Sequence, residues 1–389
     1  MNSQTPDSYA LDNFDKTRFL QTYWQKKPVV LRQAFSNFVD PLDEHELAGL
    51  AQEPDVDARV ISCNNGIWNI VHGPIDDFSE TCTGAWSLLV QSVDHQVPTA
   101  NALMAAFNFI PHWRMDDLMV SFSNQGAGVG AHIDQYDVFI IQGKGSRRWQ
   151  VGSPGNYSEH FPHPDLRQIE PFEPLIDEVL LPGDVIYIPP GFPHNGVALE
   201  NCLNYSVGFR APSQQEMLSS LADFVIDKGL FNLRYKDNGL SQRVFSGEIK
   251  QQELAAFKGL FQQVLDSAHF PTWLGHFLSQ SQQENAFDDT NTETFEAQQI
   301  IEMLNSGVCF VRQMGLKPVF IEGQSQTQQD FTFYLEGQSF YVPAPAQALV
   351  KSFLDAPQWC SKVDISQQNS MFFVQTVATM VNAGYWYPA

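Results

Sequence analysis

The sequence predicts an α+β protein in which a β-sandwich or barrel comes first, helices follow, and a small winged-helix-like module ends the chain. Three observations predict this fold class. The first 210 or so residues hold short apolar runs separated by Gly and Pro, as in antiparallel sandwiches and barrels. Helical periodicity replaces this pattern at Ser213. From residue 294 onward a helical stretch, short strand-like runs and a further apolar stretch follow one another.

The strands of the first part are predicted from apolar runs that end at turn residues. Typical turns are GAGVG at 126–130 and LPGD at 181–184. The runs are 117–123, 137–143, 147–152, 184–190 and 204–211. The stretch 12–110 has a mixed pattern, and we expect one helix there, in LDEHELAGLAQE.

The helical part begins at Ser213, which has the spacing of a capping box with Glu216. The helix that follows is expected to end at Gly229. A second helix is predicted from apolar residues on one face, and FPTWLGHFL at 270–278 predicts a third. That face consists of Leu254, Phe257, Phe261, Val264 and Leu265. Because these helices have few apolar partners of their own, we expect them to form a homodimer; packing on the barrel is the alternative.

The polar stretch 279–294 is predicted to be a linker. After it, TFEAQQIIEMLNSG is expected to form a helix that ends near Gly307. We therefore expect a catalytic domain at 1–212, a helical dimerisation domain at 213–285 and a winged-helix-like domain at 286–389. Modules of the last kind often bind DNA, but this one has four Lys and Arg against ten Asp and Glu. A structural or protein-contacting role is the better interpretation.

The charge of the whole chain favours a basic protein partner over nucleic acid. Its 22 Lys and Arg and 44 Asp and Glu give a formal net charge of −22, which repels phosphate backbones. The same charge also serves plain solubility. The five cysteines are dispersed and odd in number, so we expect neither a zinc site nor a disulfide framework, as in a reducing cytoplasm. No signal peptide or membrane-spanning run is apparent, and we expect a cytoplasmic protein without a membrane partner.

A metal-binding motif lies directly before the apolar strand at 137–143. Residues two apart on a strand point to the same side, so His132 and Asp134 face one space while Ile133 points away. His194, which follows the proline-stiffened turn of IPPGFPHNG, is the best third ligand. Two histidines and one carboxylate make the facial triad of non-haem Fe(II) oxygenases. Three coordination positions remain, two for a 2-oxo acid and one for dioxygen.

A cation in the next strand points to 2-oxoglutarate, whose distal carboxylate must be held away from the metal. A guanidinium grips a carboxylate through two parallel hydrogen bonds. Of the neighbours Arg147 and Arg148, only one can face inward; we assign Arg147 inward and Arg148 to solvent or an acidic neighbour. Ser121 and Asn204 lie on flanking strands and are candidate hydrogen-bond donors to the co-substrate, with ordinary sheet residues as the alternative.

Long segments of the chain resemble a known family. DDLMVSFSNQGAGVGAHIDQYDVFIIQGKGSRRW and PGDVIYIPPGFPHNGVALENCLNYSVGFRAP are similar to the JmjC-type 2-oxoglutarate oxygenases, and more narrowly to the bacterial ribosomal oxygenases of the RoxA/YcfD type. YWQKKPVVLRQAF, WSLLVQSVDH and NAGYWY extend the resemblance over essentially the whole chain. It implies a double-stranded β-helix (cupin-like) barrel, a helical dimerisation region and a C-terminal winged-helix module.

The resemblance also implies an activity. It is the hydroxylation of an arginine β-carbon in the large-subunit ribosomal protein L-sixteen, with Fe(II), 2-oxoglutarate and dioxygen. His132, Asp134 and His194 would bind the metal; Arg147 would pair with the distal carboxylate, with Ser121 close by. From proximity to the motif, the substrate guanidinium is expected at acidic and phenolic side chains, namely Asp116, Asp117, Asp137 and Tyr136. The alternatives are an oxygenase with another protein substrate, another cupin metalloenzyme, and a non-catalytic cupin binding module.

Overall fold

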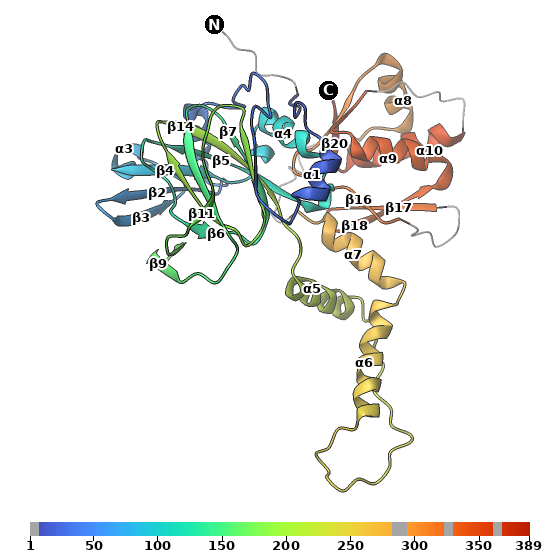
Figure 1. The fold of residues 1–389 in the computed structure, drawn as a ribbon. Helices are drawn as coiled ribbons and strands as arrows, with labels where there is room; N and C mark the ends of the chain where they lie inside the picture. The colour runs from blue at the N-terminus through green and yellow to red at the C-terminus, as the bar shows by residue number, and fades with distance from the viewer. Residues whose placement is uncertain (1–7, 282–293, 323–329, 361–367) are drawn as a thin grey trace. The chain divides into compact units, whose positions relative to one another are not determined.

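A computed structural model describes residues 8–281, 294–322, 330–360 and 368–389. The chain divides into two compact units, residues 1–211 and 212–389. Figure 1 shows the strands of the first unit in blue to green and the helices and strands of the second in yellow to red.

The first unit contains two antiparallel sheets. The larger has the order β1-β12-β7-β14-β5-β4-β2-β3 and the smaller the order β11-β8-β13-β6. The larger sheet consists of β1 (Val29–Leu31), β2 (Ala58–Asn64), β3 (Ile67–His72), β4 (Ala85–Val90), β5 (Met115–Ser123), β7 (Asp137–Gln142), β12 (Val185–Ile188) and β14 (Cys202–Phe209). The smaller consists of β6 (His132–Ile133), β8 (Arg147–Gly152), β11 (Pro174–Leu180) and β13 (Pro193–Ala198), and β9 (Glu159–His163) pairs with β10 (Leu166–Ile169).

Consecutive strands from β5 to β8 and from β11 to β14 alternate between the two sheets. This alternation is the double-stranded β-helix that the resemblance implied, and the expectation of a sandwich or barrel is confirmed. The five predicted apolar runs all form strands, at β5, β7, β8, β12 and β14.

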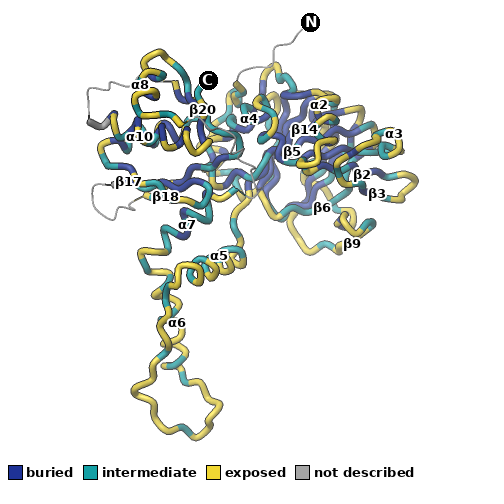
Figure 2. Tube along the Cα trace, turned by 180° about the vertical axis from the view of Figure 1, so that it is seen from behind, coloured by how far each residue is buried: buried dark blue, intermediate teal, exposed yellow. Residues whose placement is uncertain are grey.

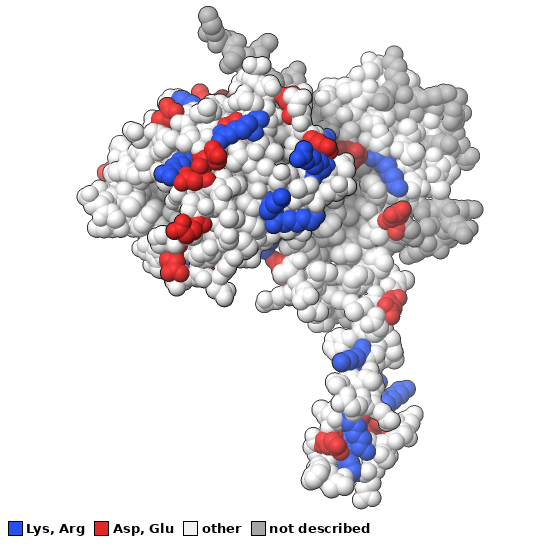
Figure 3. All heavy atoms as spheres, viewed as in Figure 1, with Lys and Arg blue, Asp and Glu red and all other residues white. Residues whose placement is uncertain are grey.

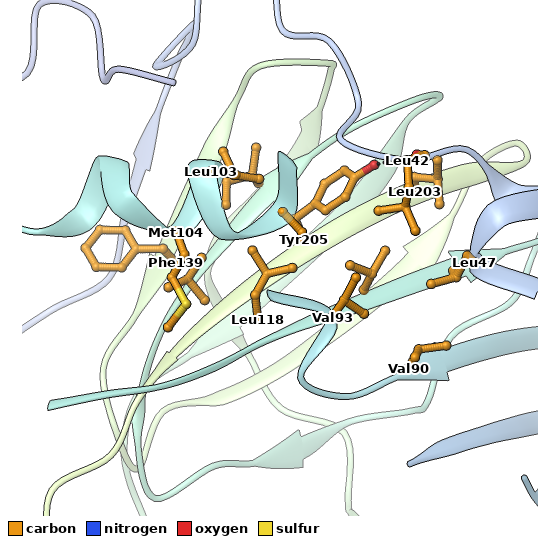
Figure 4. Packing of buried hydrophobic residues seen from close by; sticks show 14 of the residues in the cluster. Leu42, Leu47, Val90, Val93, Leu103, Met104, Leu118, Phe139, Leu203 and Tyr205 are labelled. Atoms are coloured by element: carbon orange, nitrogen blue, oxygen red, sulfur yellow. Dashed lines mark hydrogen bonds between the residues drawn. The ribbon is translucent and has the colours of Figure 1, made fainter. Parts of the chain in front are cut away.

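Side-chain alternation along β5 separates a hydrophobic core from the site. Leu118, Val120 and Phe122 enter the main core of the unit. Figure 4 shows this packing, in which Leu103 of one helix lies near Leu118 and Tyr205 of the sheet. The residues between them on β5, Met119 and Ser121, therefore face the other side of the sheet, toward the site.

The helices of this unit are α1 (Lys16–Thr22), α2 (Glu44–Leu50), α3 (Phe78–Thr81) and α4 (Pro98–Met104), with short 3-10 turns at Val93–His95, Ala105–Phe107 and His112–Arg114.

The second unit contains helices and two small sheets. The helices are α5 (Gln214–Asp227), α6 (Gln251–Leu265), α7 (His269–Ser279), α8 (Ala297–Ser306), α9 (Gln347–Asp355) and α10 (Gln368–Asn382), with a 3-10 turn at Ala344–Ala346. The sheets are β19 (Gln358–Trp359), β15 (Phe310–Arg312) and β20 (Trp386–Pro388), and β16 (Val319–Phe320), β17 (Asp330–Leu335) and β18 (Gln338–Pro343). A second hydrophobic core joins α8, α9 and α10 to these strands.

The predicted helices of this unit are confirmed. The capping box of Ser213 and Glu216 starts α5, and α8 ends at Gly307 in the left-handed conformation that favours glycine. The predicted linker lies mostly outside the described residues, and its first residue, Ser279, ends α7. In the part of the chain that the structure describes, no helix combines the length and apolar character needed to cross a membrane.

Neither α5 nor α6 contains a buried residue. Figure 2 shows both helices and the loop between them largely in the colour of exposed residues. The exposed large apolar side chains of this segment, called the arm below, are Leu218, Ile226, Leu233, Leu240, Val244, Phe245, Ile249, Leu254, Phe257, Phe261 and Leu265.

The expectation of no disulfide is wrong, because Cys309 and Cys360 form one. They are 51 residues apart in sequence, so no local spacing indicates the pair. The β15–β19 register explains it: Phe310 lies opposite Trp359, so Cys309 and Cys360 are the next opposed pair outward. Their Cα atoms are 4.3 Å apart, close to the separation of a non-hydrogen-bonded antiparallel pair.

Candidate active site

The two predicted histidine ligands meet across the smaller sheet. His132 of β6 lies opposite His194 of β13, and Asp134 follows directly after β6. Asp134 Oδ2 is 3.8 Å from His132 Nε2 and 3.5 Å from His194 Nε2. One ligand atom from each of the three residues lies within 4.8 Å of the others, so a single metal ion can contact all three.

Backbone carbonyls orient both imidazoles. His132 Nδ1 lies 2.9 Å from the carbonyl oxygen of Gly130, and His194 Nδ1 lies 3.0 Å from that of Phe192. In each case the carbonyl accepts a hydrogen bond from the Nδ1–H, which leaves the Nε2 lone pair directed toward Asp134. Metal-binding histidines are commonly held by such a hydrogen bond on the second ring nitrogen.

The protonation states that the site favours are those that bind a cation. Burial, together with the neighbouring His194, lowers the pKa of His132 to about 4. Burial of Asp134 works to raise its pKa, but its interactions with His194 and His132 prevail and keep that pKa below its ordinary value. At neutral pH His132 is therefore neutral and Asp134 is anionic, as metal coordination requires.

Arg147 faces inward and Arg148 outward, as expected from strand alternation. Arg147 is 4% exposed, whereas Arg148 pairs with Asp177 at the surface. No Asp or Glu carboxylate among the described residues lies within ion-pair distance of Arg147, and burial lowers its pKa. The guanidinium stacks over Trp149, with 5.2 Å between its carbon and the ring centroid. Its Nε has no hydrogen-bond partner among the described residues. A buried guanidinium in this state is suited to an anionic ligand.

Asn204 is a neighbour of Arg147. Its Oδ1 accepts a hydrogen bond of 3.1 Å from Arg147, and its Nδ2 donates one of 2.8 Å to Gln142. Ser121 lies opposite Asn204 on β5 and is 5% exposed. Gln142, which sequence reasoning missed, is fully buried and lies opposite Asn204 on β7. The only signal for it was a polar residue at the end of an apolar strand.

Gly196 leaves the space that Arg147 and Trp149 occupy. A Cβ added at Gly196 would lie 2.9 Å from Arg147 Nε and 2.7 Å from the Trp149 ring. The Gly196 carbonyl also accepts a hydrogen bond of 3.2 Å from Arg147. A side chain at this position would therefore displace the guanidinium.

Of the four residues expected to hold the substrate guanidinium, Tyr136 contacts the triad directly. Burial, followed by the charge of Asp134, raises the pKa of Tyr136, whose hydroxyl contacts Asp134. Asp117 and Asp116 are near enough to contribute to the same shift. The expectation for Asp137 is wrong. It is 1% exposed, and its carboxylate accepts hydrogen bonds from Arg114, Tyr187 and Gln25.

The site opens toward solvent on the side of His132 and Asp134. Both of these side chains are 24% exposed, whereas His194 is 3% exposed. A separate surface hollow, lined by residues 38–46, Lys144 and others, does not include the triad. Two of its acidic residues, Asp43 and Glu46, form a helix capping box, and Glu44 pairs with Lys144, so the triad is the better candidate for chemistry.

Comparison with known proteins agrees with this geometry. A family model described as a JmjC domain matches residues 102–217, and one described as a ROXA-like winged helix matches residues 260–387. The Escherichia coli (strain K12) protein named ribosomal protein uL16 3-hydroxylase is 42% identical over 378 residues, which cover 95% of this chain and 96% of that protein. The chain belongs to the ribosomal oxygenase family of JmjC-domain proteins.

Other members of the ribosomal oxygenase family extend the likeness. A Haemophilus influenzae protein named probable ribosomal oxygenase is 36% identical over 253 residues, 62% of each chain. The solved structure of Escherichia coli YcfD, a ribosomal oxygenase, in complex with cobalt and 2-oxoglutarate has a TM-score of 0.86 at 38% identity, covering 98% of this chain and 99% of that one. The predicted JmjC fold and winged-helix module are therefore confirmed.

Proposed function

We propose that this protein is an Fe(II)- and 2-oxoglutarate-dependent oxygenase that hydroxylates an arginine β-carbon of ribosomal protein uL16, the L-sixteen expected from the sequence. The observation that carries the proposal is a cluster of two histidines and one carboxylate in a barrel that also buries Arg147 without a carboxylate partner among the described residues. The 42% identity to a uL16 3-hydroxylase supports the substrate.

The residues present fit both groups. His132, Asp134 and His194 would hold Fe(II), and Arg147 would pair with the distal carboxylate of 2-oxoglutarate. When bound, these groups and dioxygen supply the oxidation that places one oxygen atom on a C–H carbon while 2-oxoglutarate becomes succinate and carbon dioxide. The chain contributes orientation and shelter from water.

Each protein group has a defined task. The carbonyls of Gly130 and Phe192 fix the imidazole tautomers, so both Nε2 atoms are available to the metal. Asn204, itself held by Gln142, orients the Arg147 guanidinium. Asn204 thus also acts on 2-oxoglutarate through Arg147, besides its expected role as a hydrogen-bond donor to the co-substrate. Ser121 has no side-chain hydrogen bond among the described residues, and its hydroxyl remains available for 2-oxoglutarate.

The substrate guanidinium is assigned to Asp116 and Asp117 beside Tyr136. A net charge of −22 suits a basic ribosomal protein. The Lys and Arg side chains on the face shown in Figure 3 form small separate groups, and the net charge of −22 disfavours direct DNA binding.

We also propose that the chain is a homodimer joined through the arm. Helices with no buried residue and many exposed apolar side chains lack the burial that stabilises a helix in water. A second copy supplies that burial.

The domain division follows: a catalytic domain at 1–212, a dimerisation domain at 213–285 and a winged-helix domain at 286–389. A cytoplasmic location without a membrane partner fits an enzyme that acts on a ribosomal protein.

Intact-mass spectrometry of large-subunit ribosomal proteins tests the proposal. The proteins are incubated with the enzyme, Fe(II) and ascorbate, with and without 2-oxoglutarate. We expect uL16 alone to gain one oxygen atom, only when 2-oxoglutarate is present. Succinate formation without any gain would reject uL16 as the substrate, and the absence of both would reject the oxygenase.

A further inference from the structure

Asp116 and Asp117, whose charges act on Tyr136 of the site, lie at an irregularity in β5. In the β5–β14 pairing, Val207 lies opposite Leu118, but Phe209 lies opposite Met115. Three steps along β5 thus match two along β14, which is a β-bulge. Both acidic residues of the bulge lie beside Gly208. A Cβ added to that glycine would be 3.6 Å from Asp116 Cβ and 3.6 Å from Asp117 Oδ1.

Ser92 donates two hydrogen bonds to one oxygen of the Asp117 carboxylate. Asp117 Oδ2 accepts hydrogen bonds from the Ser92 backbone N–H at 3.0 Å and from the Ser92 hydroxyl at 3.3 Å. Among the described residues, both hydrogen bonds to the Asp117 carboxylate end on Oδ2, and none ends on Oδ1. No Lys, Arg or His of the described residues pairs with this carboxylate either. The second oxygen is therefore available to a ligand.

Ser92 can donate both bonds because of its unusual backbone. It has φ 51° and ψ 37°, the left-handed conformation that non-glycine residues adopt only at a cost. The residue is 7% exposed and lies between β4 and the 3-10 turn Val93–His95. The turn is tied to β5 on the far side of Asp117, because Asp94 Oδ1 accepts a hydrogen bond of 2.8 Å from the Leu118 backbone N–H. The fold thus maintains a strained residue whose two donors converge on one carboxylate oxygen.

We propose that Ser92 is a positioning residue for the substrate arginine. It fixes the Asp117 carboxylate so that Oδ1 faces the guanidinium and the target carbon is held next to the metal. The inference rests on the proposed function, since it needs an arginine substrate. Ser92 should affect how often 2-oxoglutarate turnover leads to hydroxylation, but not how 2-oxoglutarate binds.

The test compares Ser92→Gly with wild type on an arginine-containing uL16 peptide. Glycine adopts the left-handed conformation without strain and keeps the backbone donor to Asp117, while the hydroxyl bond to Asp117 Oδ2 is lost. We expect the KM for the peptide to rise about three- to tenfold, because the lost hydrogen bond acts on the peptide only indirectly, through the orientation of the Asp117 carboxylate. Peptide hydroxylated per succinate formed should fall, while the Kd for 2-oxoglutarate and the melting temperature stay within error.

A matched control is available at Ser79. Its backbone N–H and hydroxyl also both bind one aspartate oxygen, at Asp77, on the exposed helix α3. Ser79→Gly should leave the KM for the peptide and the coupling unchanged. An unchanged KM and coupling in Ser92→Gly would overturn the inference, as would an equal loss of 2-oxoglutarate binding, which indicates general damage. If wild type does not hydroxylate the peptide, the proposed function fails instead.

Discussion

His132 and His194 lie directly opposite each other in the β6–β13 strand pair, with ring centroids 4.2 Å apart. Adjacent strands thus present both Nε2 atoms to the same carboxylate, that of Asp134. The register of one strand pair determines the geometry of the metal centre. A shift of one residue in this register would turn one histidine to the opposite face.

Asp134→Ala should remove the metal site. The two imidazoles alone would bind a divalent ion at least about a hundredfold more weakly, because an anionic ligand is lost. Titration calorimetry with Mn²⁺ checks binding, and succinate formation from 2-oxoglutarate checks activity. Asp165→Ala is the control, since Asp165 is exposed and far from the triad in sequence. Full succinate formation by Asp134→Ala would contradict the assignment of this ligand.

Gly196→Ala should weaken 2-oxoglutarate binding while the metal ligands stay in place. The new Cβ would lie 2.9 Å from Arg147 Nε, so the guanidinium must move. We expect the Kd for 2-oxoglutarate to rise about tenfold or more, the equivalent of one charge-assisted hydrogen bond. Mn²⁺ affinity should remain as in wild type. Gly239→Ala, at a position with open space around it, should change neither constant.

Binding of the arginine peptide should depend on pH near 6. Burial, and then the neighbouring Asp94, raises the pKa of Asp117 to about 6. The carboxylate is charged above this pKa and neutral below it, while arginine stays protonated throughout. The KM for the peptide should therefore rise as pH falls from 7 to 5, up to about tenfold. Asp117→Asn should raise the KM at pH 7 and flatten its pH profile. A wild-type KM that is constant over this range would exclude a charged Asp117 contact.

Reduction of the Cys309–Cys360 disulfide should destabilise the second unit. The disulfide joins residues 51 apart in sequence and so restricts the unfolded chain. A restriction of this kind typically adds about 2–4 kcal/mol to the free energy of unfolding. Thermal melts of the full chain with and without a reductant measure the effect. Cys360→Ser should melt like the reduced wild type in both conditions. Identical melts of oxidised and reduced wild type would show that the cross-link contributes nothing.

Phe261→Asp should weaken the homodimer. Phe261 lies on α6 and is 74% exposed in the single chain. In a dimer joined through the arm, an aspartate at this position would be buried without a partner charge, and the cost of removing it from water would weaken association. Sedimentation velocity should show the dimer dissociating at concentrations at least about tenfold higher than for wild type. Phe161→Asp is the control, because Phe161 is 61% exposed but lies on β9, outside the arm. A monomeric wild type would reject the dimer altogether.

Features encoded by local patterns were predictable from the sequence. Apolar runs between turn residues predicted the strands that bear Arg147 and Asn204, and the capping box of Ser213 and Glu216 predicted the start of α5. The triad could be predicted because His132 and Asp134 are two residues apart and His194 follows a distinctive turn. Strand alternation also separated Arg147 from Arg148.

Long-range register decided the features that the sequence did not reveal. Cys309 and Cys360 meet only because β15 pairs with β19. Gln142 matters only because β7 places it beside Asn204. Asp137 could not be excluded as a substrate contact until its burial against Arg114 was known. The strands β2, β3 and β4 were missed where the apolar pattern of residues 12–110 is mixed.

The fate of the two oxygen atoms of dioxygen shows whether the enzyme hydroxylates uL16. Purified enzyme, Fe(II), 2-oxoglutarate and uL16 are incubated under ¹⁸O₂, and tryptic peptides of uL16 and succinate are analysed by mass spectrometry. We expect one ¹⁸O atom on the β-carbon of a single uL16 arginine and one in the succinate carboxylate, in equal amounts. Label in succinate but in no uL16 peptide, or label in neither, would contradict it.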